Sequence, residues 1–181
     1  AINVFGNAAG MAYVHQNDII YKYINQGDIL LDELYHPKIA HFDKYLYDGC
    51  AIPIDTAICM GPELIEKSDT ITDRMDVYSY SMILYQVLLE RNPYKRCATS
   101  FKIFRSVVEN KRPEIPDGVI PSIFVELIKR CWDEDPINRP SFIEIVKEFL
   151  DRKDEYFDFN LVNRDEFERY VETAIEGLNL D

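Results

Sequence analysis

The run DRMDVYSYSMILYQVLLE, residues 73–90, restricts the fold of this chain more than any other feature. Its apolar side chains cover nearly the whole circumference of a helix instead of one stripe along it. A helix that is apolar on all sides is surrounded by protein on all sides. We therefore predict a mainly α-helical fold in which residues 73–90 form the central buried helix.

Other segments have the pattern of helices that pack around such a core. Residues 7–17 match the end of a helix with small side chains, and residues 121–132 match a further helix. Residues 141–150 are amphipathic, and Ser141 is followed three positions later by Glu144, which is the pattern of a capping box. These segments add three helices to the central one.

Short apolar runs separated by turn residues predict a small amount of β-structure. We expect short strands at residues 19–20, 29–31 and 38–40, with the last two joined as a hairpin through the turn LYHPK. Residues 43–61 have no sustained period and are predicted to be a long loop.

Composition limits the partners that this chain can have. The 181 residues carry a net charge of −12 and are 47% hydrophobic, as in an ordinary globular protein. Because an acidic surface repels phosphate, we expect no nucleic acid and no membrane as partner, and we expect protein partners instead. The cysteines at 50, 59, 97 and 131 form no CxxC pair, which indicates reduced thiols in a cytoplasmic protein without a metal site.

The composition changes after Leu150. Residues 151–181 contain ten acidic and four basic residues, so this extension carries half of the net charge. Residues 163–178 have apolar side chains at helical spacing and begin with Asn163 as a candidate cap. An amphipathic helix must bury its apolar stripe, so we predict that the extension is ordered and docked rather than a solvated acidic tail.

Several motifs, taken in chain order, resemble the C-terminal lobe of a eukaryotic protein kinase, closest to the tyrosine-kinase-like group. The resemblance covers residues 1–150. Its motifs are GMAYVHQNDII (10–20), DILLDELYHPKIA (28–40), MGPELI (60–65), DVYSYSMILYQVL (76–88) and RPEIPDGVIPSIFVELIKRCWDEDPINRPSF (112–142). No motif is decisive alone, but five in the right order and spacing are highly specific.

The resemblance implies a helical C-lobe with a short β-hairpin over residues 1–150, followed by the acidic extension 151–181. These 181 residues contain no Gly-rich phosphate loop and no strand lysine paired with a helix glutamate, so the N-lobe is absent from this chain. The family also implies structural roles for three residues. Asp76 is expected to accept backbone hydrogen bonds from the catalytic loop, and Glu63 is expected to form a buried ion pair with Arg139.

The catalytic loop departs from the family pattern, which is approximately HRDLKPxNILLD in an active kinase. Here Tyr21, Lys22 and Tyr23 replace His, Arg and Asp, Asn25 replaces the loop Lys, and Asp28 replaces the metal-binding Asn. In an active kinase the Asp accepts the proton of the substrate hydroxyl. A phenol, with an ordinary pKa near 10, is no carboxylate base at neutral pH.

The metal-binding motif is also altered. The Asp-Phe-Gly triplet of active kinases corresponds here to His41, Phe42 and Asp43. Imidazole is a poor ligand for Mg²⁺, a hard cation that prefers oxygen. Asp28 still offers carboxylate oxygens, so that replacement alone disables nothing.

We therefore predict a catalytically inactive protein kinase-like domain, a pseudokinase, that acts as a binding or scaffolding module. No catalytic residue is intact, since the degenerate positions are Tyr23, Asn25, Asp28 and His41, and we expect no cofactor and no metal. The alternative is a weak or atypical protein kinase that transfers phosphate from ATP to protein Ser, Thr or Tyr and uses ATP and Mg²⁺. A third reading is nucleotide binding without transfer.

Some residues have two readings that the sequence leaves open. Tyr23 and His41 either fill a collapsed pocket or take part in an interaction. Tyr45, Tyr47 and Thr56 are ordinary solvated loop residues or sites of phosphorylation. The oligomeric state is not fixed by the sequence.

Overall fold

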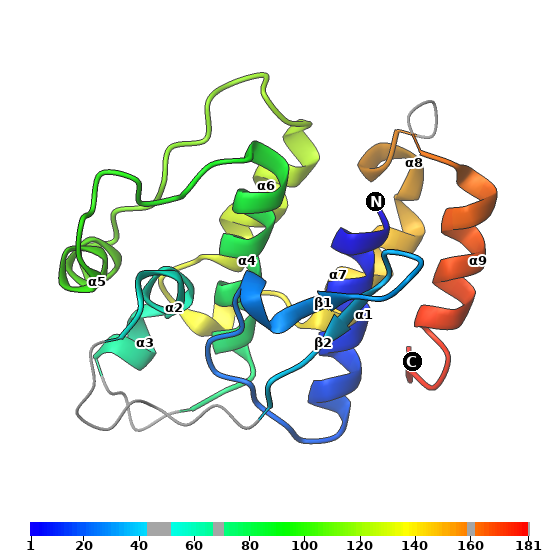
Figure 1. The fold of residues 1–181 in the computed structure, drawn as a ribbon, viewed down its shortest axis with the longest axis horizontal. Coiled ribbons are helices and arrows are strands. Elements are labelled where there is room, and N and C mark those ends of the chain that lie inside the picture. The colour runs from blue at the N-terminus through cyan, green and yellow to red at the C-terminus, as the bar shows by residue number, and fades with distance from the viewer. Residues whose placement is uncertain (43–51, 67–70, 159–161, 181) are drawn as a thin grey trace. The chain divides into compact units, whose positions relative to one another are not determined.

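The computed structural model of the protein describes residues 1–42, 52–66, 71–158 and 162–180 (Figure 1). The chain divides into two compact units. The first unit comprises residues 1–20, 27–40 and 140–181, and the second comprises residues 21–26 and 41–139. Among the described helices, none has both the length and the apolar character needed to cross a membrane.

The first unit is built from helices and one hairpin. Its elements are α1 (Ile2–Gln16), β1 (Ile29–Leu31), β2 (Pro37–Ile39), α7 (Phe142–Asp151), α8 (Lys153–Tyr156) and α9 (Arg164–Ala174). A short 3-10 turn, η1 (Gln26–Asp28), precedes β1. Helix α1 contacts α7, α9 and β2, so these three elements of the unit pack on a common helix.

The second unit is helical in its described part. Its elements are α2 (Ile54–Cys59), α3 (Pro62–Ile65), α4 (Arg74–Leu89), α5 (Ser100–Val108), α6 (Ser122–Cys131) and the 3-10 turn η2 (Pro136–Asn138). Helix α4 contacts both α2 and α6, and α5 contacts α2 and α3. The predicted central helix is therefore confirmed, within one residue at each end.

Helix α4 is buried because its sequence has no polar face. Every residue from Met75 to Tyr85 is buried, including the polar side chains in that range. The two buried serines are satisfied, since the Ser79 hydroxyl donates to the backbone oxygen of Cys59 at 2.7 Å and that of Ser81 donates to the backbone oxygen of Tyr78 at 2.6 Å. The helix reaches solvent only at its ends, at Arg74 and around Val87.

Two sequence-based predictions of local structure are wrong. Residues 19–20 form no strand, because the chain closes the end of α1 there and the amide of Ile19 donates to the backbone oxygen of Val14. The predicted loop 43–61 contains helix α2, whose residues are held by packing against α4 and α5 and not by an amphipathic period.

The prediction for one candidate phosphorylation site is also corrected by this helix. Thr56 lies in α2 and is buried, so it is not a solvated loop residue. Tyr45, Tyr47 and Asp43 lie outside the described residues.

The hairpin of the first unit is short and antiparallel. Ile29 pairs with Ile39 and Leu31 pairs with Pro37. The turn is closed by the carboxylate of Asp32, which accepts the amides of Leu34 and His36, both at 2.9 Å. These bonds, that of His36 first, lower the pKa of Asp32.

Both predicted helix caps are present. The Ser141 hydroxyl accepts the amide of Glu144, and the Glu144 carboxylate accepts the amide of Ser141, which completes a capping box at the start of α7. The side chain of Asn163 accepts the amide of Glu166 at 3.2 Å and caps α9.

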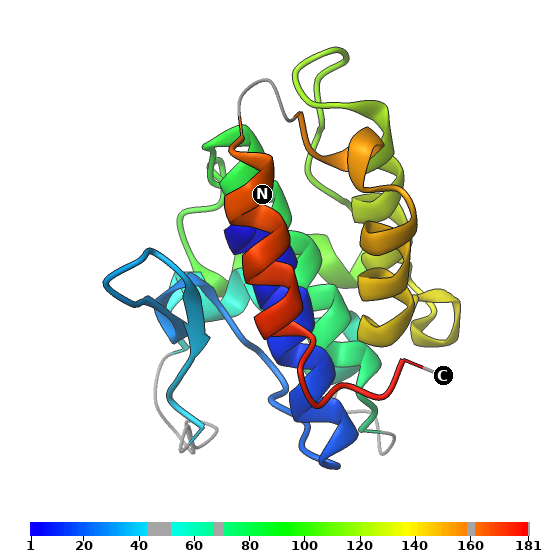
Figure 2. The same ribbon diagram turned by 90° about the vertical axis from the view of Figure 1, so that its right-hand side faces the viewer.

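The extension is docked, as predicted, and α9 lies along α1 (Figure 2). The contact is a cluster of aromatic rings. Phe167 of α9 lies with its ring centroid 5.8 Å from Phe5 and 4.8 Å from Phe157, and Phe149 joins the cluster from α7. Because Phe5, Phe149, Phe157 and Phe167 are all buried, this cluster supplies the apolar contact that the amphipathic pattern requires.

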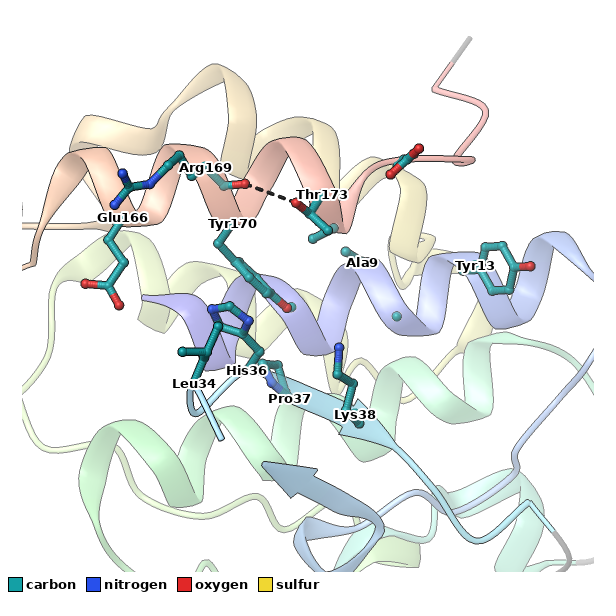
Figure 3. Close-up of a pocket in the computed structure, with 14 residues that line it drawn as sticks. Ala9, Tyr13, Leu34, His36, Pro37, Lys38, Glu166, Arg169, Tyr170 and Thr173 are labelled. Atoms are coloured by element: carbon teal, nitrogen blue, oxygen red, sulfur yellow. Dashed lines mark hydrogen bonds between the residues drawn. The ribbon is translucent and has the colours of Figure 1, made fainter. Parts of the chain in front are cut away.

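Beside this cluster a cavity of about 620 Å³ lies between α1, the hairpin turn and α9. Figure 3 shows Tyr170 reaching from α9 toward His36 and Pro37 at one side of it. The rings of Tyr170 and His36 are 4.5 Å apart. Burial first, and then the charge of Asp32, raises the pKa of Tyr170 to about 12.

Gly6 is the residue of α1 that lets Tyr170 approach. A Cβ at Gly6 would lie 2.0 Å from the hydroxyl oxygen of Tyr170 and 2.5 Å from Cγ of Pro37. We therefore predict that Gly6→Ala lowers the free energy of unfolding by about 1–3 kcal/mol, as overpacking does, measured by urea denaturation. Removing the hydroxyl with Tyr170→Phe in that background should recover part of the loss.

Gly10, one turn later in α1, provides the matched control. A Cβ there would meet only the end of the flexible Ile39 side chain, at 2.9 Å. Gly10→Ala should therefore leave stability unchanged or raise it, because alanine favours the helix by about 0.5–1 kcal/mol. Equal stability of the Gly6→Ala protein and the wild type would contradict the close packing of Tyr170.

Candidate functional site

The site begins with the carboxylate of Asp76, in the first turn of α4. Oδ2 accepts the amide of Tyr21 at 2.8 Å, and Oδ1 accepts the amide of Lys22 at 2.5 Å. Asp76 is fully buried, and both of its oxygens are therefore used to hold the backbone of the loop. This is the role that the family resemblance implied for Asp76, and it is confirmed.

The backbone that Asp76 holds is strained. Lys22 has a φ of +84°, in a region that residues other than glycine rarely adopt. Such a conformation costs on the order of 1–3 kcal/mol and persists only where the surroundings determine it. The two hydrogen bonds to Asp76 contribute to this, since they hold the amide of Tyr21 and the amide of Lys22 itself.

The same loop is tied to the segment that follows the hairpin. The hydroxyl of Tyr21 donates to the backbone oxygen of His41 at 3.0 Å. The ring of Tyr21 packs edge-on against Phe42, with centroids 5.4 Å apart. Tyr21 therefore joins two segments that the sequence identified separately as degenerate.

The candidate residues differ in how accessible they are. Tyr23 is 2% exposed and Asn25 is also buried, both in the second unit. His41 is exposed, and Phe42 next to it is 54% exposed. Asp28 belongs to the first unit, where it is buried at the end of η1 and its backbone oxygen accepts the amide of Ala40 at 2.8 Å.

This arrangement limits the chemistry of the loop. A general base must reach the proton that it abstracts, and a buried phenol at Tyr23 neither carries the charge nor meets the solvent. His41 offers imidazole nitrogen where Mg²⁺ prefers oxygen. Within the described ranges, no three His, Cys, Asp or Glu side chains are grouped in a way that could hold a metal ion.

A buried ion pair lies in the same unit. Arg139 Nη1 donates to Glu63 Oε1 at 2.6 Å, and Nη2 donates to Oε2 at 3.0 Å. The remaining donors of Arg139 are also used, since Nε donates to the backbone oxygen of Asp133 and Nη1 also reaches that of Arg74. The pairing of Glu63 with Arg139 that the resemblance implied is therefore confirmed.

Sequence reasoning missed one functional contact of the loop. It treated Tyr21 only as a replacement for His, but its hydroxyl and ring hold the segment at residues 41–42. The spacing of twenty residues gives no local signal for such a contact, because it depends on the tertiary fold.

Comparison with known proteins identifies the family. The sequence profile described as protein tyrosine and serine/threonine kinase matches residues 4–149. This chain belongs to that family. The predicted kinase C-lobe, helical with a two-stranded antiparallel hairpin, is confirmed.

The relatives include kinases of two eukaryotes. The "Probable serine/threonine-protein kinase drkC" of Dictyostelium discoideum is 37% identical over 150 residues, which cover 77% of this chain and 20% of that protein. The "RGS domain-containing serine/threonine-protein kinase A" of the same organism is 36% identical over 147 residues, 78% of this chain and 12% of the relative. The "Serine/threonine/tyrosine-protein kinase HT1" of Arabidopsis thaliana is 31% identical over 150 residues, 81% of this chain and 38% of the relative.

The chain thus spans a minor part of each of these kinases. The coverage ranges from 12% to 38% of their length. The matched part of this kinase domain includes both the Asp76 contact and the Glu63–Arg139 pair.

The contact made by Asp76 predicts a specific effect of Asp76→Asn. The amide nitrogen of Asn cannot accept a hydrogen bond, so the amide of Tyr21 or Lys22 loses its partner. We expect the free energy of unfolding to fall by about 1–3 kcal/mol and the amides of these two residues to exchange faster with solvent. Asp117→Asn, at an exposed position of the same unit, is the control and should change neither quantity. Unchanged exchange at Tyr21 and Lys22 in the Asp76 variant would contradict the assignment.

Breaking the Glu63–Arg139 ion pair is predicted to lower the free energy of unfolding more than Asp76→Asn does. Glu63→Gln leaves the buried guanidinium of Arg139 without its counter-charge, at a cost of about 3–5 kcal/mol. Glu66→Gln, at the exposed end of the same short helix, should shift stability by less than about 0.5 kcal/mol. Unfolding by denaturant measures the stability of the two variants. Similar midpoints for both variants would show that the pair does not stabilise the lobe.

Proposed function

We propose that this kinase-family lobe is a pseudokinase that binds proteins as a scaffold and transfers no phosphate. One observation carries the proposal. Tyr23, at the position of the catalytic Asp in active kinases, is buried with 2% exposure in a loop whose backbone Asp76 fixes. The substitution therefore lies inside an ordered loop.

Three separate parts of the transfer chemistry are affected. Tyr23 supplies no carboxylate to orient and deprotonate a hydroxyl. Asn25 supplies no positive charge beside a transferring phosphoryl group. His41 supplies nitrogen in place of the oxygen that would hold Mg²⁺. Each loss would weaken a kinase, and their combination supports an inactive one.

The structural contacts support a folded module. Asp76 and the Glu63–Arg139 pair keep the geometry that the family uses to hold the lobe together. A lobe with an intact core and altered chemistry suits a binding role. On its motifs we assign it to the tyrosine-kinase-like group.

The partners that we propose are proteins, with no nucleic acid and no membrane, in agreement with the net charge of −12. A cytoplasmic location goes with this proposal. We propose no cofactor, and ATP with Mg²⁺ enters only under the alternative function.

That alternative is a weak or atypical protein kinase. It is favoured by the carboxylate of Asp28, which offers oxygen to a cation at least as well as the Asn of the family. The relatives named above are called serine/threonine or serine/threonine/tyrosine kinases. The two functions differ in whether phosphate moves, which can be measured directly.

The decisive assay measures transfer of the γ-phosphate of ATP to protein substrates and to the protein itself. It uses this chain together with any sequence that precedes Ala1 in the encoded protein. We expect transfer no higher than in a heat-denatured sample, because the base and the metal ligand are replaced. Transfer by the native protein that Asp28→Ala abolishes would establish the alternative.

Thermal unfolding with ATP separates binding from transfer. A ligand that binds the folded state at a hundred times its Kd stabilises by about 2.7 kcal/mol, which raises the melting temperature by several degrees. We expect no such rise, with or without Mg²⁺. A rise that depends on Mg²⁺ and disappears in Asp28→Ala would assign nucleotide binding to the lobe.

A further inference from the structure

The second unit contains a cavity of about 460 Å³ that the proposed function does not use. It lies between the C-terminal end of α4, the segment 91–97, α5 and the segment 111–116. Five cationic side chains and one carboxylate line it, so the lining carries a formal charge of +4 in a chain of net charge −12. We refer to it as the basic cavity, and its charged residues are Arg91, Lys95, Arg96, Lys111, Arg112 and Glu114.

Among the described residues, most of these cationic side chains have no carboxylate partner. Lys111 pairs with Glu109 at 2.6 Å, and Glu109 is shared with Arg105 at 2.7 Å. The bond to Lys111 first, and then that to Arg105, lowers the pKa of Glu109 to about 2. In the part of the chain that the structure describes, Lys95 and Arg96 have no carboxylate within ion-pair distance.

Arg112 is held by carbonyl groups in place of a counter-charge. Its Nε donates to the backbone oxygen of Trp132 and its Nη1 donates to that of Val107, both at 3.0 Å. Its Nη2 is buried and meets no acceptor among the described residues. The guanidinium also lies over the ring of Tyr78, 5.4 Å from its centroid, so it is fixed in place by carbonyl groups and an aromatic face, with no carboxylate as counter-charge among the described residues.

The wall of the basic cavity is aromatic and rigid. The hydroxyl of Tyr85 donates to the backbone oxygen of Glu114 at 2.9 Å, and that of Tyr94 donates to the backbone oxygen of Lys111 at 3.3 Å. Both tyrosines are buried, as is Pro113 next to them. These bonds fix the two rings, which line the cavity beside its cations.

The cavity in the first unit has no such excess of charge. Its lining contains two cations, Lys38 and Arg169, and two carboxylates, Glu166 and Glu176, so its formal charge is zero. A positive lining therefore distinguishes the basic cavity from the cavity of the first unit.

We propose that the basic cavity binds the phosphoryl group of an organic phosphate monoester. A phosphate monoester carries nearly two negative charges at neutral pH, and its oxygens match the donor fork of arginine. A single carboxylate would leave most of the positive charge uncompensated. The tyrosine wall takes the organic part of the ligand, which is either a phosphorylated side chain or a small soluble phosphate. The site is independent of whether the lobe transfers phosphate.

A binding titration on the full chain tests the site. The probes are phenyl phosphate, N-acetyl-phosphoserine amide and inositol hexakisphosphate, each followed by isothermal calorimetry at two salt concentrations. We expect binding that weakens as salt rises, and about tenfold weaker binding by the double variant Lys95→Gln with Arg96→Gln. Lys102→Gln with Lys129→Gln removes two exposed cations that do not line the cavity, and it should bind like the wild type.

The probes also separate the two sources of the ligand. Preference for the amino-acid phosphate would assign a phosphorylated protein side chain, and preference for inositol hexakisphosphate would assign a soluble polyphosphate. The absence of binding by all three probes, or equal weakening in the two double variants, would overturn the site.

Cys97 provides a measurement on the wild-type chain that needs no added ligand. It lines the basic cavity and is only partly buried, whereas Cys59 and Cys131 are buried. We compare its alkylation by iodoacetate, an anion, with that by neutral iodoacetamide, and identify the labelled peptide by mass. The ratio of rates should be about threefold higher than for free cysteine and should fall at high salt. A ratio equal to that of free cysteine would overturn the positive potential on which the site depends.

Discussion

The carboxylate of Asp76 is the contact on which the candidate site depends. It projects from a helix that is buried along eleven consecutive residues, so its own position cannot vary much. From there it holds two successive amides of the loop, including that of a residue with positive φ. Moving a carboxylate from water into the protein interior costs free energy. The two charge-assisted hydrogen bonds offset that cost. The rigidity of the core is in this way transmitted to the loop.

This arrangement separates the shape of the loop from its chemistry. Asp76 binds backbone N–H groups, which every residue type except proline provides, so the side chains at positions 21–25 can change while the loop keeps its path. The phenols of Tyr21 and Tyr23 then become packing groups, and Tyr21 gains a contact with the segment at residues 41–42. A kinase fold that binds loop backbone in this way can lose its catalytic residues and keep its structure, which is the basis of the function proposed here.

The sequence predicted those parts of the structure that local pattern determines. The central helix, the capping box at Ser141, the cap at Asn163 and the docked helix α9 all follow from periodicity and cap chemistry, and all are present. The prediction of a strand at residues 19–20 was wrong, because two isoleucines at the end of a helix have the same local pattern as a short strand. Helix α2 was missed because packing against α4 and α5 stabilises it without an amphipathic period.

The same distinction holds for the site. The positions of Asp76, Glu63 and Arg139 were available through the resemblance to kinases, because their spacing is part of the motifs. The burial of Tyr23 and the contact between Tyr21 and His41 were not available, because they depend on which distant segments meet. The basic cavity is similar: its cations lie in two stretches about twenty residues apart, and neither stretch is conspicuous alone in an acidic sequence.

The docking of α9 on α1 has a consequence for how the boundaries of this protein are drawn. The family profile ends at residue 149, but the compact unit that contains α1 continues through the extension. Phe167 covers Phe5, a residue from the first helix, so the two ends of the sequence share one aromatic cluster. Evolutionary similarity and physical cooperativity thus define different limits here. A fragment that ends where the profile ends would expose aromatic surface. It would therefore be less soluble than the full chain.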